Sequence, residues 1–223
     1  MVVDVDTSIP KGVIAPDTKF RKIWDFFTLA AVIVFAIRIP QQISFSALKV
    51  ELFNFLVDLF LDLFFLLDIY ARMNHFAITE DGVLVSSPKE FRKVYIKTEL
   101  IGDLVSIVPA STIGWILNVN GRIYGLMRLI QIVRLQRFAK YFNCSIDALY
   151  ETFHVVISTA VLRIIQIFLL VILLCHWLGC IYHLIGDLEG GDENWLDVDE
   201  IKDSSIGFKY LRSFYWALYT GEF

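Results

Sequence analysis

The sequence predicts an all-α, polytopic membrane protein, and three observations lead to this fold class. Hydrophobic residues make up 57% and aromatic residues 15% of the 223 residues, whereas soluble domains are roughly 45–50% apolar. The apolar residues gather in runs separated by short polar segments, as expected for a series of helices that cross a bilayer. Basic residues also recur at three-residue intervals within one apolar run. We therefore expect a helical membrane bundle that contains one charged helix.

The chain begins with a polar tail, residues 1–22, which ends in a basic run. We expect this tail to be cytoplasmic, because Lys and Arg are enriched on that side of a membrane. The first predicted helix covers residues 24–39, and we expect Pro40 to end it, because proline interrupts the backbone hydrogen bonds of a helix. No cleavable signal peptide is visible, since residues 1–15 are mixed and polar.

The second predicted helix, residues 52–73, is long enough to span but contains Asp58, Asp62 and Asp68. Carboxylates inside a membrane segment are costly unless they are paired. We therefore expect basic partners for these three side chains.

The loop of residues 74–97 is basic, and it fixes the expected orientation. The positive-inside rule places this loop and the amino terminus in the cytoplasm. The third predicted helix, residues 100–117, then starts on the cytoplasmic side near Asp103 and contains Pro109, where we expect a kink.

The fourth predicted helix, residues 122–142, carries the charged row. Its members are Arg128, Arg134, Arg137 and Lys140, and Gln131 occupies the one uncharged position of the row. A spacing of three stays on one face only if the segment is locally a 3₁₀ helix. A solvated amphipathic face is the ordinary interpretation of such a pattern, but Arg arrays inside a membrane domain are also how voltage sensors store charge.

Predicted topology brings Asp68 of the second helix and Asp103 of the third to a similar depth near the inner membrane face. We expect them to form an acidic pair that binds arginines of the fourth helix, with Phe64 one turn from Asp68 on the same face. Asp58 and Asp62 form a second pair at another level. The alternative is that each aspartate is only a helix-end or interfacial residue.

A short polar linker, residues 143–156, precedes the fifth predicted helix, about 161–186, which contains the clearest uncharged run of the chain. The acidic segment 187–205 should lie outside, where such a loop would concentrate cations. Residues 206–220 form an aromatic helix that is too short and too charged to span, so we expect a re-entrant helix. His176 and His183 are expected to pack or to form hydrogen bonds, and no catalytic residue, metal site or cofactor is predicted.

Several stretches resemble one family of channels. They are FLLDIYARMN in the second helix, DGVLVSSPKEFRKVYIKTELIGDLVSIVP in the loop and third helix, RLIQIVRLQRFAKYF in the fourth, CHWLGCIYHLIG in the fifth and FYWALYT near the end. In this combination they resemble the voltage-gated-like cation channels of the cyclic-nucleotide-gated, hyperpolarization-activated and ether-à-go-go superfamily. The likeness extends from Trp24 over nearly the whole remaining chain.

The resemblance implies a voltage-sensor-like domain at residues 23–142 and a partial pore domain at residues 157–223. It implies a homotetramer or heterotetramer of channel subunits in the lipid bilayer, most naturally the plasma membrane, that passes potassium or monovalent cations unselectively and binds no nucleic acid. The sensing charges are Arg128, Arg134, Arg137 and Lys140; the countercharge and charge-transfer residues are Asp58, Asp62, Phe64 (or Phe65), Asp68 and Asp103; and the start of the pore helix is Phe214, Tyr215, Trp216 and Thr220.

Other classes fit less well. A stand-alone voltage sensor or proton channel would need only the first four helices, and a non-conducting truncated subunit is a further alternative because no selectivity-filter motif is present in the sequence. An enzyme would require a nucleophile–base pair, a phosphate loop or a metal motif, none of which the sequence contains. A transporter would show internal repeats, and we find none.

Overall fold

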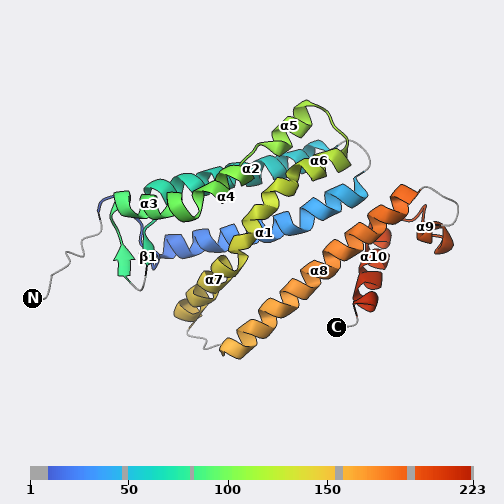
Figure 1. Ribbon diagram of the computed structural model, residues 1–223. Coiled ribbons are helices and arrows are strands. Elements are labelled where there is room, and N and C mark those ends of the chain that lie inside the picture. Colours follow the sequence, from blue (N-terminus) through green and yellow to red (C-terminus); the bar gives the residue numbers. More distant parts are fainter. Residues whose placement is uncertain (1–9, 47–49, 81–82, 154–157, 190–193, 222–223) are drawn as a thin grey trace, which may run out of the picture. The chain divides into compact units, whose positions relative to one another are not determined.

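The computed structural model describes residues 10–46, 50–80, 83–153, 158–189 and 194–221. These residues are mainly helical, with one antiparallel hairpin whose register pairs Thr79 with Leu84, so the predicted all-α class is confirmed (Figure 1). The elements are α1 (Lys19–Phe45), α2 (Leu52–Asn74), β1 (Ile78–Glu80), β2 (Val83–Val85), α3 (Pro88–Thr98), α4 (Leu100–Ser106), α5 (Ala110–Ile116), α6 (Gly121–Met127), the 3₁₀ helix η1 (Arg128–Arg137), α7 (Phe138–Phe153), α8 (Thr159–Glu189), α9 (Trp195–Val198) and α10 (Ile206–Thr220).

Two helices of the described part, α1 and α8, are long and apolar enough to cross a membrane, and a third span arises if α3 and the α4–α5 segment are counted as one bent span. Helix α2 is long enough at 23 residues, but its three aspartates make it more polar than these helices. The observation agrees with the cost expected for charges in a bilayer. The partners of these aspartates are therefore central to the fold.

The chain divides into two compact units that interleave along the sequence. The first unit comprises residues 1–32, 59–108 and 133–154, and the second comprises residues 33–58, 109–132 and 155–223. This division does not follow the predicted boundary between a sensor domain and a pore domain, which stays a prediction. We describe each unit by itself.

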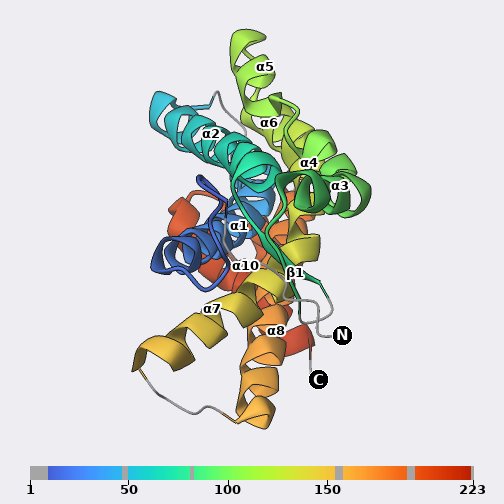
Figure 2. The same cartoon turned by 90° about the vertical axis from the view of Figure 1, so that its left-hand side faces the viewer.

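The first unit has an aromatic core. Leu29 of α1 packs with Tyr141 and Phe142 of α7, and Phe138 and Ile146 lie against this cluster. The segment before α1 is tied to the end of α2 by a parallel bridge between Ile14 and Phe76. In both ribbon views the β1–β2 hairpin lies beside α3 (Figures 1 and 2).

In the second unit, α10 packs along α8, as both ribbon views show (Figures 1 and 2). Gly179 permits this packing, because a Cβ at this position would lie 3.1 Å from the Cα of Phe214. The ring of Trp216 stacks on Tyr182, with 3.8 Å between ring centroids. Helix α10 thus has the predicted bounds and a specific partner helix.

The expectation that Pro40 ends the first helix is wrong, since α1 continues through Pro40 to Phe45. Proline has no N–H, so the carbonyl of Ala36 cannot receive its usual helical hydrogen bond. The indole N–H of Trp177 in α8 donates to this carbonyl at 3.0 Å, and His176 contacts the carbonyl of Ile37 at 2.9 Å. A helix can therefore contain this proline, because a neighbouring helix supplies a donor.

Within the predicted linker at 143–156, α7 remains helical to Phe153, and the linker role of this segment stays a prediction. The segment contains no Gly or Pro, and its apolar residues Phe142, Ile146, Leu149 and Phe153 recur at helical spacing. The acidic segment 187–205 is likewise partly helical, since α8 extends to Glu189 and α9 lies within it. Residues 154–157 and 190–193 lie outside the described part.

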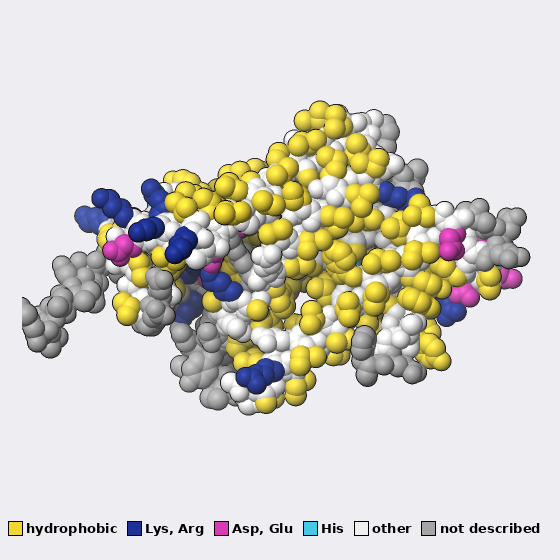
Figure 3. Space-filling model, viewed as in Figure 1, with side chains coloured by type: hydrophobic (Ala, Val, Ile, Leu, Met, Phe, Trp, Pro, Cys, Tyr) yellow, Lys and Arg dark blue, Asp and Glu magenta, His cyan; other side chains and the backbone are white. Residues whose placement is uncertain are grey.

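The third predicted helix is interrupted before Pro109, between α4 and α5, as its proline suggested. Many side chains on the exterior are large and apolar, as the space-filling view shows (Figure 3). Phe53, Ile101 and Ile116 are each more than 70% exposed. Such exposure is costly in water but is expected where helices contact lipid.

Candidate functional site: a buried row of basic side chains

Most of the charged row lies on the 3₁₀ helix η1, Arg128–Arg137, and Lys140 follows on α7. With three residues per turn, side chains three positions apart point in the same direction, so Arg128, Gln131 and Arg134 share one face. All three are buried, with exposed fractions of 0%, 1% and 6%. A solvated amphipathic face would leave these side chains in water, so the structure contradicts that alternative.

Asp58 of α2 is the centre of the charged cluster in the second unit, and its carboxylate is fully buried. Arg128 Nη1 lies 2.5 Å from Asp58 Oδ2, and Arg38 Nε of α1 donates to Oδ1 at 3.0 Å. Gln42 Nε2 and Tyr124 Oη also donate to Oδ2, at 2.9 and 3.1 Å. One carboxylate therefore accepts from four side chains, which compensates for the cost of burying its charge.

Arg128 is held by further contacts within the same cluster. It donates to the side-chain oxygens of Gln42 and Gln131, at 3.1 Å in each case. Its guanidinium carbon lies 4.9 Å from the ring centroid of Phe35 and 5.8 Å from that of Tyr124. These carbonyl oxygens and ring faces replace water around a fully buried cation.

Gly125 allows α6 to approach α1 closely enough for this cluster to form. A Cβ at position 125 would lie 2.7 Å from a side-chain carbon of Ile43 and 2.9 Å from its backbone nitrogen. Gly125 follows Tyr124 directly, so the same close approach brings the tyrosine hydroxyl to Asp58.

Arg134 lies in the first unit and binds mainly to α4. It donates to Ser106 Oγ at 3.1 Å and to the Ser106 carbonyl at 2.7 Å. Asp62 lies further away, at 3.8 Å, and the guanidinium carbon lies 4.0 Å from the ring centroid of Phe65. The space beside Arg134 and Phe65 is only about 10 Å³, room for at most one water molecule.

The other two basic residues of the row differ from this pattern. Lys140 is half exposed and pairs with Glu99 at 2.6 Å, a carboxylate that the sequence did not single out. The backbone of Arg137 ends η1, while its side chain lies outside the described part of the structure. The described basic side chains of the row are therefore two buried arginines and one half-exposed lysine.

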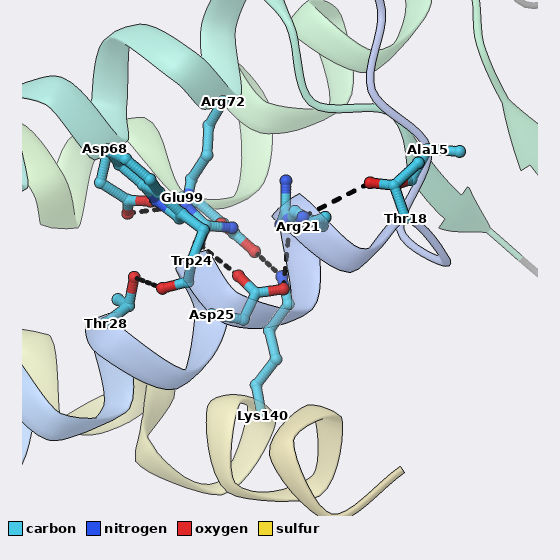
Figure 4. Close-up of polar contacts among 10 residues, drawn as sticks. All are labelled: Ala15, Thr18, Arg21, Trp24, Asp25, Thr28, Asp68, Arg72, Glu99 and Lys140. Carbon is cyan, nitrogen blue, oxygen red and sulfur yellow. Dashed lines mark hydrogen bonds and ion pairs between the residues drawn. The ribbon is translucent and has the colours of Figure 1, made fainter. Parts of the chain in front are cut away.

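Asp68 and Asp103 both lie in the first unit and are both buried. Asp68 accepts from Arg72 Nε at 2.8 Å and from the indole of Trp24 at 2.7 Å, and Figure 4 shows these contacts. Asp103 accepts from the hydroxyl of Tyr95. Asp68 is thus bound by an arginine four residues along its own helix, and its proposed pairing with the fourth helix stays a prediction.

The aromatic residue that contacts Arg134 is Phe65, the second of the two that the sequence allowed. Phe64 instead stacks on Trp24, with 5.1 Å between ring centroids. Sequence reasoning missed Arg38, Gln42, Tyr124, Ser106 and Glu99. Helical spacing offered one signal for them, since Arg38 and Gln42 are four apart, as are Tyr124 and Arg128.

The predicted pore-helix residues all lie on α10, in the second unit. Phe214 faces Gly179, Trp216 stacks on Tyr182, and Tyr215 stacks on Tyr219. Thr220 is the last residue of the helix. Within the described residues, no group of three or more His, Cys, Asp or Glu side chains could hold a metal ion.

Comparison with known proteins places this sequence in a family. Residues 21–222 match the model of the ion transport protein family. The chain is 31% identical to the human voltage-gated delayed rectifier potassium channel KCNH5 over 193 residues, which cover 85% of this chain and 19% of the relative. It is 27% identical to the human potassium/sodium hyperpolarization-activated cyclic nucleotide-gated channel 2 over 92% of this chain and 25% of the relative. It is 25% identical to the Arabidopsis thaliana potassium channel AKT2/3 over 93% of this chain and 26% of the relative.

The chain thus spans about a fifth to a quarter of the length of these relatives. The family match covers most of the chain, and together with the apolar helices it identifies a multi-pass membrane protein that is not an enzyme. The chain belongs to the ion transport protein family, among the voltage-gated-like cation channels of the cyclic-nucleotide-gated, hyperpolarization-activated and ether-à-go-go superfamily.

Proposed function

We propose that the chain is the transmembrane part of a cation channel subunit in which η1 acts as the voltage sensor. The observation that carries this proposal is the burial of Arg128 and Arg134, with Gln131 midway between them, on a 3₁₀ helix, where each arginine has acceptors of its own. Charges inside a membrane domain are costly and mark functional sites. A purely structural helix would bury apolar residues at these positions.

The contacts suggest how charge would move. Arg128 is bound by a cluster centred on Asp58, and Arg134 by Ser106, Asp62 and the ring of Phe65. A shift of the helix by one three-residue step would bring each basic residue to the position of its neighbour in the row, about 6 Å along the axis. Each cation would then contact side-chain oxygens and aromatic ring faces at every step, so no arginine would be exposed to lipid hydrocarbon without a partner.

The orientation is part of the proposal. We place the amino terminus and the segment 74–97 in the cytoplasm, because this segment carries Lys89, Arg92, Lys93 and Lys97. Labelling of a cysteine introduced at Ser86 with a membrane-impermeant thiol reagent tests this placement. We expect labelling only after the cells are permeabilised. Labelling of intact cells would show that the proposed orientation is wrong.

We propose that α8 and α10 contribute to the pore of a homotetramer or heterotetramer that passes potassium or monovalent cations. Support comes from the specific packing of α10 against α8 through Gly179 and Trp216. The named relatives are potassium and potassium/sodium channels. This helix pair favours a pore-bearing subunit over a stand-alone sensor, because a stand-alone sensor would require only the first four predicted helices.

A voltage-clamped cell with a fluorescent dye on an introduced cysteine tests the sensor. Leu117, just before α6, is 64% exposed and suits the label, and Cys144→Ser removes the exposed native thiol. We expect fluorescence to follow voltage when the dye is at Leu117→Cys. A dye at Lys202→Cys serves as the control, because this lysine lies in an exposed ion pair. Equal, voltage-independent signals at both sites would refute the proposal.

A further inference from the structure

A pocket of about 300 Å³ lies in the second unit, where α9 and α10 each pack against α8 (Figure 1). Most of its lining is aromatic, and these side chains are Tyr182, Trp195, Tyr215, Trp216 and Tyr219. Small-molecule sites in proteins have volumes of roughly 300–1,000 Å³. The pocket can therefore hold a group of the size of a lipid headgroup.

One wall of the pocket is ordered by contacts around Trp195. A Cβ at position 186 would lie 2.7 Å from Cδ1 of this indole, so Gly186 lets the ring lie against α8. The indole N–H donates to the Tyr182 carbonyl at 3.3 Å, and the two rings stack with 4.5 Å between their centroids. Asn194 caps α9, because its side chain accepts from the backbone N–H of Asp197 at 3.1 Å. The wall is thus built from the protein's own contacts.

Tyr215 and Tyr219 form the more exposed side of the pocket. They lie four residues apart on α10 and therefore share one face of the helix. Their rings are nearly parallel, with 18° between the planes and 6.3 Å between the centroids, and the side chains are 57% and 67% exposed. Aromatic ring faces attract cations, and such aromatic sites recognise quaternary ammonium groups. This side of the pocket therefore suits a methylated cation.

An ion pair completes the lining. Arg212 Nε donates to Asp199 Oδ2 at 2.7 Å, which uses one of the five N–H donors of a guanidinium. The two side chains are 46% and 30% exposed, so each keeps polar atoms that a ligand can reach. Glu189 also acts electrostatically on Tyr182. The charged groups near the rings are thus one cation and two carboxylates, which disfavours a ligand that carries only negative charge. A zwitterion can satisfy both members of the ion pair.

The position of the pocket along α8 corresponds to the edge of a bilayer. Helix α8 has 31 residues and is about 46 Å long at 1.5 Å per residue, whereas the hydrocarbon core is about 30 Å thick. The ends of α8 therefore reach the headgroup region, and Tyr182 lies within two turns of its last residue, Glu189. Tyr and Trp are enriched at this depth. A lipid headgroup is the zwitterion that is abundant there.

We propose that this pocket binds the phosphocholine headgroup of a membrane lipid. The trimethylammonium group would contact the rings of Tyr215 and Tyr219 beside Asp199, and the phosphodiester would accept from Arg212. The proposal requires that α8 crosses the bilayer, and it stands whether or not η1 senses voltage. An ordinary belt of interfacial aromatic residues would instead contact all headgroups alike.

The experiment measures which lipids the purified chain retains. The chain in detergent is incubated with an equimolar mixture of phosphatidylcholine, phosphatidylethanolamine and phosphatidylglycerol with identical acyl chains, and the bound lipids are counted by native mass spectrometry. Phosphatidylethanolamine has the same phosphodiester but no methyl groups on its ammonium, and phosphatidylglycerol has no cation. We expect phosphatidylcholine to be enriched roughly two- to fivefold over phosphatidylethanolamine, the factor that corresponds to one exposed cation–π contact, and more strongly over phosphatidylglycerol.

The aromatic contribution is tested with the double variant Tyr215→Leu and Tyr219→Leu. Both side chains are exposed, so the change carries little folding risk, and it should abolish the enrichment over phosphatidylethanolamine. Phe208→Leu is the matched control, because Phe208 is an exposed aromatic residue of α10 outside the pocket. This control should retain the enrichment.

The ionic contribution is tested with Asp199→Asn, which leaves Arg212 as the charged group of the lining. We expect the preference to shift from phosphatidylcholine toward phosphatidylglycerol. Asp197→Asn is the matched control, because this carboxylate pairs with Lys202 and should leave the preference unchanged.

Equal retention of the three lipids by the wild type would overturn the proposal, and it is the result expected if a second subunit fills the pocket. An enrichment that persists in both the tyrosine double variant and Asp199→Asn would also overturn it. Soluble phosphocholine at millimolar concentration should not displace the bound lipid, because the acyl chains hold the headgroup at this depth. Displacement would assign the pocket to a soluble zwitterion and contradict the lipid assignment.

Discussion

Replacement of Asp58 by Asn is the sharpest test of the charged cluster in the second unit. The carboxylate accepts from Arg38 on one oxygen and from Arg128, Gln42 and Tyr124 on the other. An amide offers only one acceptor oxygen and turns the other position into a donor. In either orientation of the amide, at least one donor would face another donor, and the buried guanidinium of Arg128 and the partly buried one of Arg38 would lose their counter-ion.

The magnitude follows from the burial of Arg128 and Asp58, which are both fully buried. Removal of one partner of a buried ion pair costs about 3–5 kcal/mol. Each elementary charge that crosses the membrane field contributes about 2.3 kcal/mol per 100 mV. If two to three charges cross per subunit, the loss of Asp58 would shift the voltage midpoint by roughly 40–110 mV. The shift would be in the direction that disfavours the state in which Arg128 binds Asp58.

Voltage-clamp fluorometry with the dye at Leu117→Cys measures this shift. Asp197→Asn is the matched control, because Asp197 lies in an exposed pair with Lys202 and such pairs contribute about 0–1 kcal/mol. The double variant Asp58→Asn with Arg128→Gln should shift less than the sum of the single changes, because the two residues form one interaction. A shift for Asp58→Asn no larger than the control, or fully additive effects, would refute the reasoning.

Three further predictions concern packing and charge. Trp177→Phe removes the donor to the Ala36 carbonyl and should lower the free energy of unfolding by about 1–3 kcal/mol, measured by thermal unfolding in detergent; an unchanged midpoint would show that the carbonyl needs no donor from α8. Gly125→Ala should cost about 1–3 kcal/mol by overpacking against α1, whereas Gly207→Ala, which meets no atom within 4 Å, should be neutral in the same assay. Gln131→Arg should add a sensing charge and steepen the fluorescence–voltage relation. It should also reduce expression, because it removes an acceptor from Arg128 and introduces a like charge beside it. A shallower relation would argue against movement of this position through the membrane field.

The sequence predicted the order of the long apolar helices because their apolar runs and charges are local features, but it treated residues 74–97 as a loop, where the structure has the β1–β2 hairpin and α3. It also predicted the condition for a one-sided charged row, a 3₁₀ segment, which the structure has. Pro40 was misleading because its effect depends on Trp177, more than a hundred residues away in sequence. No local pattern could reveal that a distant indole would donate a hydrogen bond to the Ala36 carbonyl.

Side-chain partners were harder to predict than helices. Phe64 and Phe65 are neighbours, and the choice between them depends on a helix rotation of about 100°, which Trp24 helps to fix by stacking on Phe64. Asp68 was expected to bind a distant arginine, but Arg72 lies four residues away on the same helix and is within direct reach. Asp58, in contrast, binds the predicted class of partner, and its contact with Arg128 depends on the close approach at Gly125.

The charge moved per molecule tests the voltage-sensor proposal most directly. Transient capacitive currents from cells that express the chain, normalised to the number of surface molecules, give this charge for the wild type, Arg128→Gln and Arg134→Gln. Arg212→Gln is the control, because Arg212 lies on α10 in an exposed pair with Asp199. The account predicts a saturating charge in the wild type that falls in both η1 variants, by up to one elementary charge each, and stays constant in the control. Absence of charge movement in the wild type, or an equal charge in all four proteins, would contradict the assignment of η1 as a voltage sensor.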